Sequence, residues 1–173
     1  DGPLASWEWG TEGARVLLCT HDNPDPDSIA SAMALGRLLE VRRGAKASLT
    51  FGGVLGRAEN RAMVRLLKIP LTPWKRVEMD SIDVVGLVDT QPEARNHPLT
   101  PEVVGQRAMI CIDHHPQRPQ SANAAFSDVG GSFGATCTLL VHYLHEAGVV
   151  PDATLATALF YGLKPAVVAV VLE

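Results

Sequence analysis

The stretch LLCTHDNPDPDSIASAMAL, from Leu17 to Leu35, passes from an apolar run through a cluster of polar residues into a helical pattern. Residues 14–20 form a short apolar segment between turn residues, which is typical of a buried strand. Ser28 to Arg43 carries apolar residues near helical spacing, and Asp27 or Ser28 can cap this helix. A strand that leads directly into a helix is the first half of a βαβ unit.

The same alternation continues along the chain. Strands are expected over residues 46–51, 82–90 and 107–115, with a short exposed strand within 121–129, and helices over 57–67, 135–146 and 153–161. Alternating strands and helices with right-handed crossovers predict an α/β fold with a doubly wound, mostly parallel sheet and flanking helices. In such sheets, ligands bind beyond the carboxyl ends of the strands.

The composition suits one globular domain, because 173 residues with 46% apolar content can bury a substantial core. A formal net charge of −4 does not attract the chain to nucleic acid, so an anionic substrate would need metal ions, helix N-termini or a few cations. Cys19, Cys111 and Cys137 lie in apolar or small-residue segments, which predicts reduced thiols and a cytoplasmic location. The apolar run 166–172 is too short to cross a bilayer, so we expect no membrane segment.

Three of the expected strands run into a polar cluster at the same point, their carboxyl end. The first cluster is His21, Asp25 and Asp27, the second is Asp89, and the third is Asp113, His114 and His115. Parallel strands end at a common edge, where crowded carboxylates would repel one another and raise their pKa values. Divalent cations relieve this repulsion, and oxygen with imidazole ligands suits Mn²⁺, Mg²⁺, Fe or Zn²⁺. Two such ions about 3.5–4 Å apart can activate water and hold a phosphoryl group.

Each cluster also has a plain structural interpretation. The DNPDPD segment could be a turn and a helix cap, Asp89 could cap a loop, and one histidine of DHH could be a core residue. These interpretations do not explain why all three clusters follow equivalent strand ends, so we favour a metal site. His97, His142 and His145 are interpreted as structural or surface residues.

Five segments in this order resemble the DHH phosphoesterase superfamily. They are HDNPDPDSIASAMAL, GLVDTQP, CIDHH, GATCTLLVHYL and ATALFYGLK, and the resemblance covers residues 15–164. The superfamily includes RecJ-type exonucleases, oligoribonuclease/pAp phosphatases, cyclic-dinucleotide phosphodiesterases and family II inorganic pyrophosphatases.

The resemblance implies a metal ligand for most of the clustered residues. His21 and Asp25 would bind one ion, Asp27 and His114 would bind the other, and Asp89 would bridge the two and hold the nucleophilic water. Manganese is the usual metal of the family, and magnesium is the alternative.

The remaining implied roles concern the substrate. Asp113 would orient the ligands, and His115 would contact the substrate phosphate and assist proton transfer. Arg57 in GRAEN and Gly134 after the glycine turn are further candidates for phosphate contacts, although a solvated arginine and a helix entry explain them equally well.

Two departures from the family pattern concern the end of the chain. Members usually continue YGLK with a threonine–aspartate pair, whereas Ala166 here takes the place of the aspartate that completes the second metal site. The resemblance also implies a C-terminal domain, which we do not expect within these 173 residues. We therefore expect an N-terminal extension over 1–13, a DHH domain over 14–164, and a tail or truncated linker over 165–173. A C-terminal domain in the parent protein and a homodimer are the expected partners.

The resulting hypothesis is a manganese-dependent phosphoesterase of RecJ-like type. Its substrate would be a short oligonucleotide, a nucleotide such as pAp, or a dinucleotide, which places nucleic-acid binding and exonuclease activity among the expectations. Three alternatives stay open: a catalytically impaired regulatory or binding domain, an inorganic pyrophosphatase-like hydrolase, and a plain α/β domain with a non-catalytic acidic edge.

Overall fold

The chain folds around six parallel strands in the order β3-β2-β1-β4-β5-β6. The structure is a computed structural model that describes residues 13–131 and 133–171, and for 165–171 only the course of the backbone. The strands are β1 (Arg15–Thr20), β2 (Lys46–Phe51), β3 (Leu71–Pro73), β4 (Val84–Val88), β5 (Ala108–Asp113) and β6 (Phe126–Val129). The expected doubly wound α/β fold is confirmed, and the sheet is entirely parallel.

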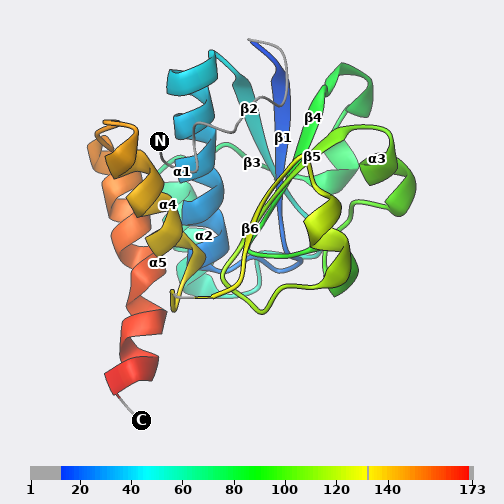
Figure 1. The fold of residues 1–173 in the computed structure, drawn as a ribbon. Coiled ribbons are helices and arrows are strands. Elements are labelled where there is room, and N and C mark those ends of the chain that lie inside the picture. The colour runs from blue at the N-terminus through cyan, green and yellow to red at the C-terminus, as the bar shows by residue number, and fades with distance from the viewer. Residues whose placement is uncertain (1–12, 132, 172–173) are drawn as a thin grey trace.

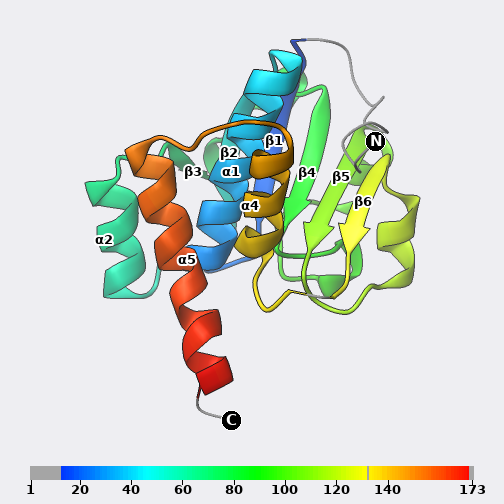
Figure 2. The same cartoon turned by 60° about the vertical axis from the view of Figure 1, so that its left-hand side comes forward.

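Helices cover the two faces of the sheet unequally. The helices are α1 (Pro26–Arg43), α2 (Ala58–Leu66), α3 (Pro101–Gly105), α4 (Thr136–Glu146) and α5 (Ala153–Val171). Figures 1 and 2 show α1, α2, α4 and α5 together on one face of the sheet, and Figure 1 shows the short α3 on the other side. The larger core cluster lies under the four helices, where Leu18, Leu35 and Leu140 are fully buried. A smaller cluster around Val85 and Leu87 fills the opposite face.

The central strands are apolar on both faces, as expected for a covered parallel sheet. β1 pairs with β2 on one side and with β4 on the other, so the order of the strands reverses between β1 and β4. Ligands of open α/β sheets bind at this type of switch point, outside the carboxyl ends of the strands. In Figure 2 the strand arrows point downward, so this edge is the lower one.

Several expected boundaries shift for local reasons. The predicted strand 82–90 ends at Val88 because Asp89 adopts a left-handed φ of 61°, which a strand does not accommodate. The cap of α1 is Asp25, not Asp27 or Ser28, and it forms a capping box with Ser28. The short strand β3 was not predicted, since its three residues carry too little periodicity to indicate a strand.

The C-terminal helix is longer than its sequence pattern suggested. α5 continues through residues 165–171, which belong to the segment expected to be a tail. Residues 172–173 and residues 1–12 of the expected N-terminal extension lie outside the described residues. At Gly162 this helix approaches α1 closely, since an added Cβ would lie 3.1 Å from the carbonyl oxygen of Pro26 and 3.2 Å from Cys137 Sγ. The packing therefore holds α5 against the first turn of α1.

The three cysteines are free and buried, as predicted. Among the described residues, no helix combines the length and the apolar character that crossing a membrane requires.

Candidate active site

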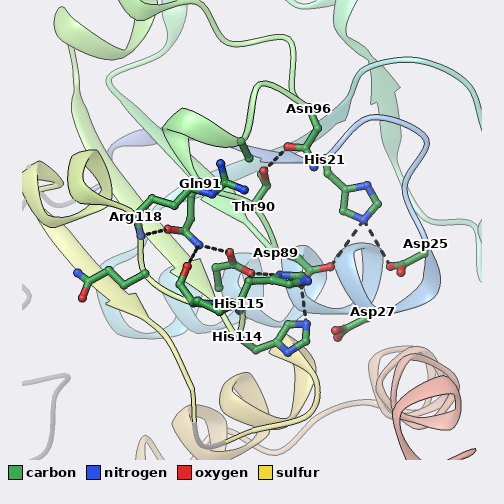
Figure 3. A pocket seen from close by; sticks show the side chains of 14 residues that line it. His21, Asp25, Asp27, Asp89, Thr90, Gln91, Asn96, His114, His115 and Arg118 are labelled. Carbon is green, nitrogen blue, oxygen red and sulfur yellow. Dashed lines mark hydrogen bonds and ion pairs between the residues drawn. The ribbon is translucent and has the colours of Figure 1, made fainter. Parts of the chain in front are cut away.

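The three polar clusters converge on one pocket at the carboxyl ends of β1, β4 and β5. All seven clustered residues line it, and its volume is about 620 Å³, which is in the range of ligand sites. The residues are His21, Asp25, Asp27, Asp89, Asp113, His114 and His115. Figure 3 shows Asp89 at the centre, with Asp25 and His21 on one side and His114 and His115 on the other. We call this cavity the Asp89 pocket.

The loop after β1 holds His21 in a defined tautomer. His21 Nδ1 lies 2.8 Å from the carbonyl oxygen of Asp22, which can only accept a hydrogen bond, so Nδ1 carries a proton. His21 Nε2 then faces Asp25 Oδ1 and Asp89 Oδ2, each at 3.7 Å. Asn23, with a left-handed φ of 56°, anchors the loop by accepting the backbone N–H of Val54.

Asp89 is a buried carboxylate, 5% exposed, that faces both sides of the pocket. Its Oδ1 accepts a hydrogen bond of 2.7 Å from Thr136 Oγ1 and lies 3.6 Å from His114 Nε2, while its Oδ2 faces His21. Two groups of side chains have ligand atoms close enough to hold a metal ion, and both include Asp89. One group is His21, Asp25 and Asp89, and the other is Asp89, His114 and His115.

Burial and neighbouring groups shift the pKa values of three residues of the pocket. Burial, followed by the neighbouring charge of Asp27, raises the pKa of Asp89 to about 8. Burial opposes a charge on His21, but hydrogen bonding to Asp25 and to the Asp22 carbonyl raises the pKa of His21 to about 9. Burial likewise disfavours the charged form of Asp25, yet His21 and the Ser28 amide lower the pKa of Asp25 to about 2.

Asp113 orients His115. Asp113 Oδ1 accepts a hydrogen bond of 2.8 Å from His115 Nδ1 and a second one from the His115 backbone N–H at 3.3 Å. Gln91 Nε2 donates to Asp113 Oδ2 at 2.7 Å, so both carboxylate oxygens are held. With Nδ1 donating, His115 Nε2 keeps its lone pair for a proton or a ligand.

Asp27 has a different environment from the other aspartates. Its Oδ2 accepts the backbone N–H of Thr136 at 2.9 Å, and its Oδ1 accepts the backbone N–H of Cys137 at 2.8 Å. The N-cap residue of α4, Ala135, offers no side-chain acceptor, so Asp27 from α1 caps α4 instead. Asp27 belongs to neither metal-capable group of the described residues, and its predicted role as a ligand stays a prediction.

Two other predicted residues lie away from the lining of the pocket. Arg57 is the exposed residue that precedes α2, and Gly134 is exposed just before α4; neither lines the Asp89 pocket. Ala166 lies within α5, and its side chain is outside the described part of the structure.

The structure adds polar residues that the sequence motifs did not identify. Thr136 links Asp89 to the backbone N–H of His114, and Gln91, 1% exposed, links Asp113 to the loop that follows His115. Thr90 donates to Asn96 on the pocket wall. Gln91 lies within the segment GLVDTQP and Thr136 within GATCTLLVHYL, but only the fold shows where their side chains point.

Comparisons with known proteins identify the family and the fold. A family model described as "DHH family, N-terminal domain" matches residues 15–163. The uncharacterized protein MJ1633 of Methanocaldococcus jannaschii is 40% identical over 151 residues, which are 87% of this chain and 30% of that protein. The crystal structure of an exopolyphosphatase-related protein from Bacteroides fragilis shares the fold, with a TM-score of 0.69 and 14% identity over 88% of this chain and 46% of that one. The chain therefore spans less than half the length of either protein.

Proposed function

This chain belongs to the DHH family, and from that membership together with the pocket geometry we propose that the protein is a metal-dependent phosphoesterase. The observation that supports this most is the shared position of Asp89, which stands in both metal-capable groups. A carboxylate between two ligand groups is the arrangement that a two-metal hydrolase needs.

The donor atoms of the pocket fit hard or borderline divalent ions. They are carboxylate oxygens and imidazole nitrogens, whereas the thiols of Cys19, Cys111 and Cys137 are buried and have raised pKa values. Three histidines favour Mn²⁺ over Mg²⁺, and the absence of thiolate donors disfavours a structural zinc site. Such ions, when bound, lower the pKa of water and neutralise the charge of a phosphoryl group.

The side chains of the chain itself would hold and align the reactants. His21 with Asp25 on one side of Asp89, and His114 on the other side, would hold the ions. Asp113 keeps the His115 ring in one orientation, so His115 Nε2 can donate a hydrogen bond or a proton to a phosphate oxygen. Thr136 donates a hydrogen bond to Asp89, and Asp27 accepts the backbone N–H of Thr136, so the first turn of α4 helps to position Asp89.

For the substrate, we propose a nucleotide or a short oligonucleotide. A cavity of about 620 Å³ accommodates a nucleotide, and its polar lining suits phosphate and sugar groups. The name of the Bacteroides fragilis protein, exopolyphosphatase-related, makes a polyphosphate the second candidate. We also propose that the parent protein has a further domain and that it forms a homodimer.

The test is hydrolysis of a phosphodiester by the intact protein with and without Mn²⁺, for the wild type and Asp89→Asn. Because several kcal/mol of transition-state stabilisation depend on bound ions, Asp89→Asn should lower kcat/KM by about a thousandfold or more. Asp83→Asn, a substitution at a half-exposed surface ion pair, is the matched control and should leave activity unchanged.

Two results would contradict the proposal. Unchanged hydrolysis by Asp89→Asn would remove Asp89 from the centre of the reaction. Tight Mn²⁺ binding measured by elemental analysis, without any turnover of phosphodiesters or polyphosphate, would favour a catalytically impaired binding domain instead.

A further inference from the structure

The Asp89 pocket is strongly acidic, yet it carries one permanent cation. Four aspartates line it, and among the described lining residues Arg118 is the single lysine or arginine. Figure 3 shows Arg118 and Gln91 on the side of the pocket away from Asp25 and Asp27. The pocket thus has an acidic half with the metal-capable groups, and a second half lined by Thr90, Gln91, Asn96 and Arg118.

The backbone of Arg118 is held rigidly at this position. Its N–H donates to the buried Gln91 Oε1 at 2.7 Å, and its carbonyl oxygen accepts from Ser121 Oγ at 2.6 Å. Glu93 Oε2 accepts the backbone N–H of Gln120 at 3.0 Å, which fixes the turn on its other side. Gln91 also binds Asp113, so the same amide holds Arg118 and the carboxylate that orients His115.

The guanidinium group of Arg118, in contrast, is mostly uncommitted. Its Nη1 donates to the carbonyl oxygen of Glu93 at 3.3 Å, and within the described residues it forms no ion pair. A rigid backbone with an exposed guanidinium is well suited to binding a ligand, because few new degrees of freedom are lost when the ligand binds. Arginine recognises phosphate through parallel N–H donors.

We infer that Arg118 binds a second phosphate group of the substrate, so that the protein selects substrates with at least two phosphates. This inference rests on the proposed function, in which the first phosphate is held at the metal-capable groups. The second phosphate would belong either to a nucleotide terminus or to a polyphosphate chain, and both present the same chemistry to Arg118.

The experiment compares the dinucleotides pApA and ApA, which share one phosphodiester and differ by a 5′-phosphate. Steady-state hydrolysis by the intact protein is measured for the wild type, Arg118→Ala and Arg118→Lys. Loss of one charge-assisted contact should lower kcat/KM for pApA by about tenfold to a hundredfold in Arg118→Ala and change kcat/KM for ApA by less than about twofold. Arg118→Lys should restore part of the loss.

Arg95→Ala is the matched control, because Arg95 is exposed on a nearby turn but does not line the pocket. It should leave both substrates unaffected. Circular dichroism of each variant shows whether it is folded; removal of a guanidinium with one long hydrogen bond should not disturb the fold.

Equilibrium binding separates this inference from the proposed function. Phosphorothioate-linked pApA and ApA resist hydrolysis, so calorimetry measures the contribution of the 5′-phosphate without turnover. If binding depends on Arg118 and the 5′-phosphate together but hydrolysis is absent, the inference stands and the proposed function fails. If Arg118→Ala loses the same affinity for both dinucleotides, or loses none, tripolyphosphate decides between two conclusions. Weaker binding of tripolyphosphate by Arg118→Ala would identify the second phosphate as part of a polyphosphate. Unchanged binding of tripolyphosphate would overturn the inference.

Discussion

Asp89 combines three features that rarely coincide in one residue. It has a left-handed φ, it is almost fully buried, and its two carboxylate oxygens face different histidines. Backbone strain and burial of an ionisable group each cost free energy, so they persist only where the surrounding structure compensates for them. Functional sites are where such groups accumulate, and a bound cation would supply the compensation here.

Proton release is the first consequence of this arrangement. Below pH values of about 8 and 9, Asp89 and His21 hold protons because their pKa values are raised, and both protons must leave before a cation binds. We expect Mn²⁺ binding near pH 7 to release protons, and the apparent affinity to rise as the pH increases from about 6 to about 9. Calorimetry in buffers of different ionisation enthalpy measures the number of protons released on Mn²⁺ binding. His21→Gln should release fewer protons than the wild type. A binding enthalpy that is the same in every buffer would contradict the expected proton release.

Gln91 is the second residue for which we predict the effect of a substitution, here on the stability of the protein. Gln91→Ala deletes hydrogen bonds to Asp113, to the carbonyl of Pro116 and to the Arg118 amide. Leaving a buried carboxylate oxygen and an amide without partners should destabilise the protein by about 2–3 kcal/mol. Urea unfolding without metal tests this, with the exposed Gln106→Ala as control. An unchanged midpoint would show that water replaces all three bonds.

At the scale of elements, one carboxylate of α1 caps the beginning of α4. Asp27, in the first turn of α1, accepts the first two backbone amides of α4, and Thr136 from the same turn of α4 binds Asp89. α4 has no side-chain cap from its own N-cap residue. It is therefore positioned by Asp27, which follows closely after His21 and Asp25 in the sequence. A displacement of α4 would move Asp89 and the His114 amide together.

Removing this cap should be costly even in metal-free protein. Asp27→Ala leaves two buried amides unpaired, and although it relieves repulsion with Asp89, we expect a net loss of about 1–3 kcal/mol in the free energy of unfolding. Asp152→Ala, which removes an exposed cap of α5, should cost less, because water can replace that bond. Urea unfolding in EDTA compares the two, and equal losses would mean that Asp27 contributes no more than an ordinary surface cap.

At the scale of the whole molecule, the strand order places three sequence-distant strand ends beside one another. β1, β4 and β5 are neighbours in the sheet, although about seventy residues separate β1 from β4. Ions held between their carboxyl ends would link these strands and α1, so metal binding and global stability should be coupled.

Metal addition should therefore raise the melting temperature. At a free Mn²⁺ concentration about a hundredfold above Kd, linkage adds about 2.7 kcal/mol, which corresponds to about 5–10 °C for a chain of this size. Asp89→Asn should lose most of this increase, whereas Asp83→Asn should retain it. Differential scanning calorimetry with Mn²⁺ and with EDTA measures the difference, and an equal increase in all three proteins would place the binding elsewhere.

The sequence by itself determined the alternation of elements, the parallel sheet and the convergence of seven polar residues, because strand and helix patterns are local and parallel strands must end at a common edge. Only the tertiary structure decided which of these residues share ligand positions, that Asp27 caps a helix more than a hundred residues away, and that Arg118 rather than Arg57 lines the pocket. The direction of a side chain depends on packing between distant segments, and no local pattern in the sequence encodes that packing.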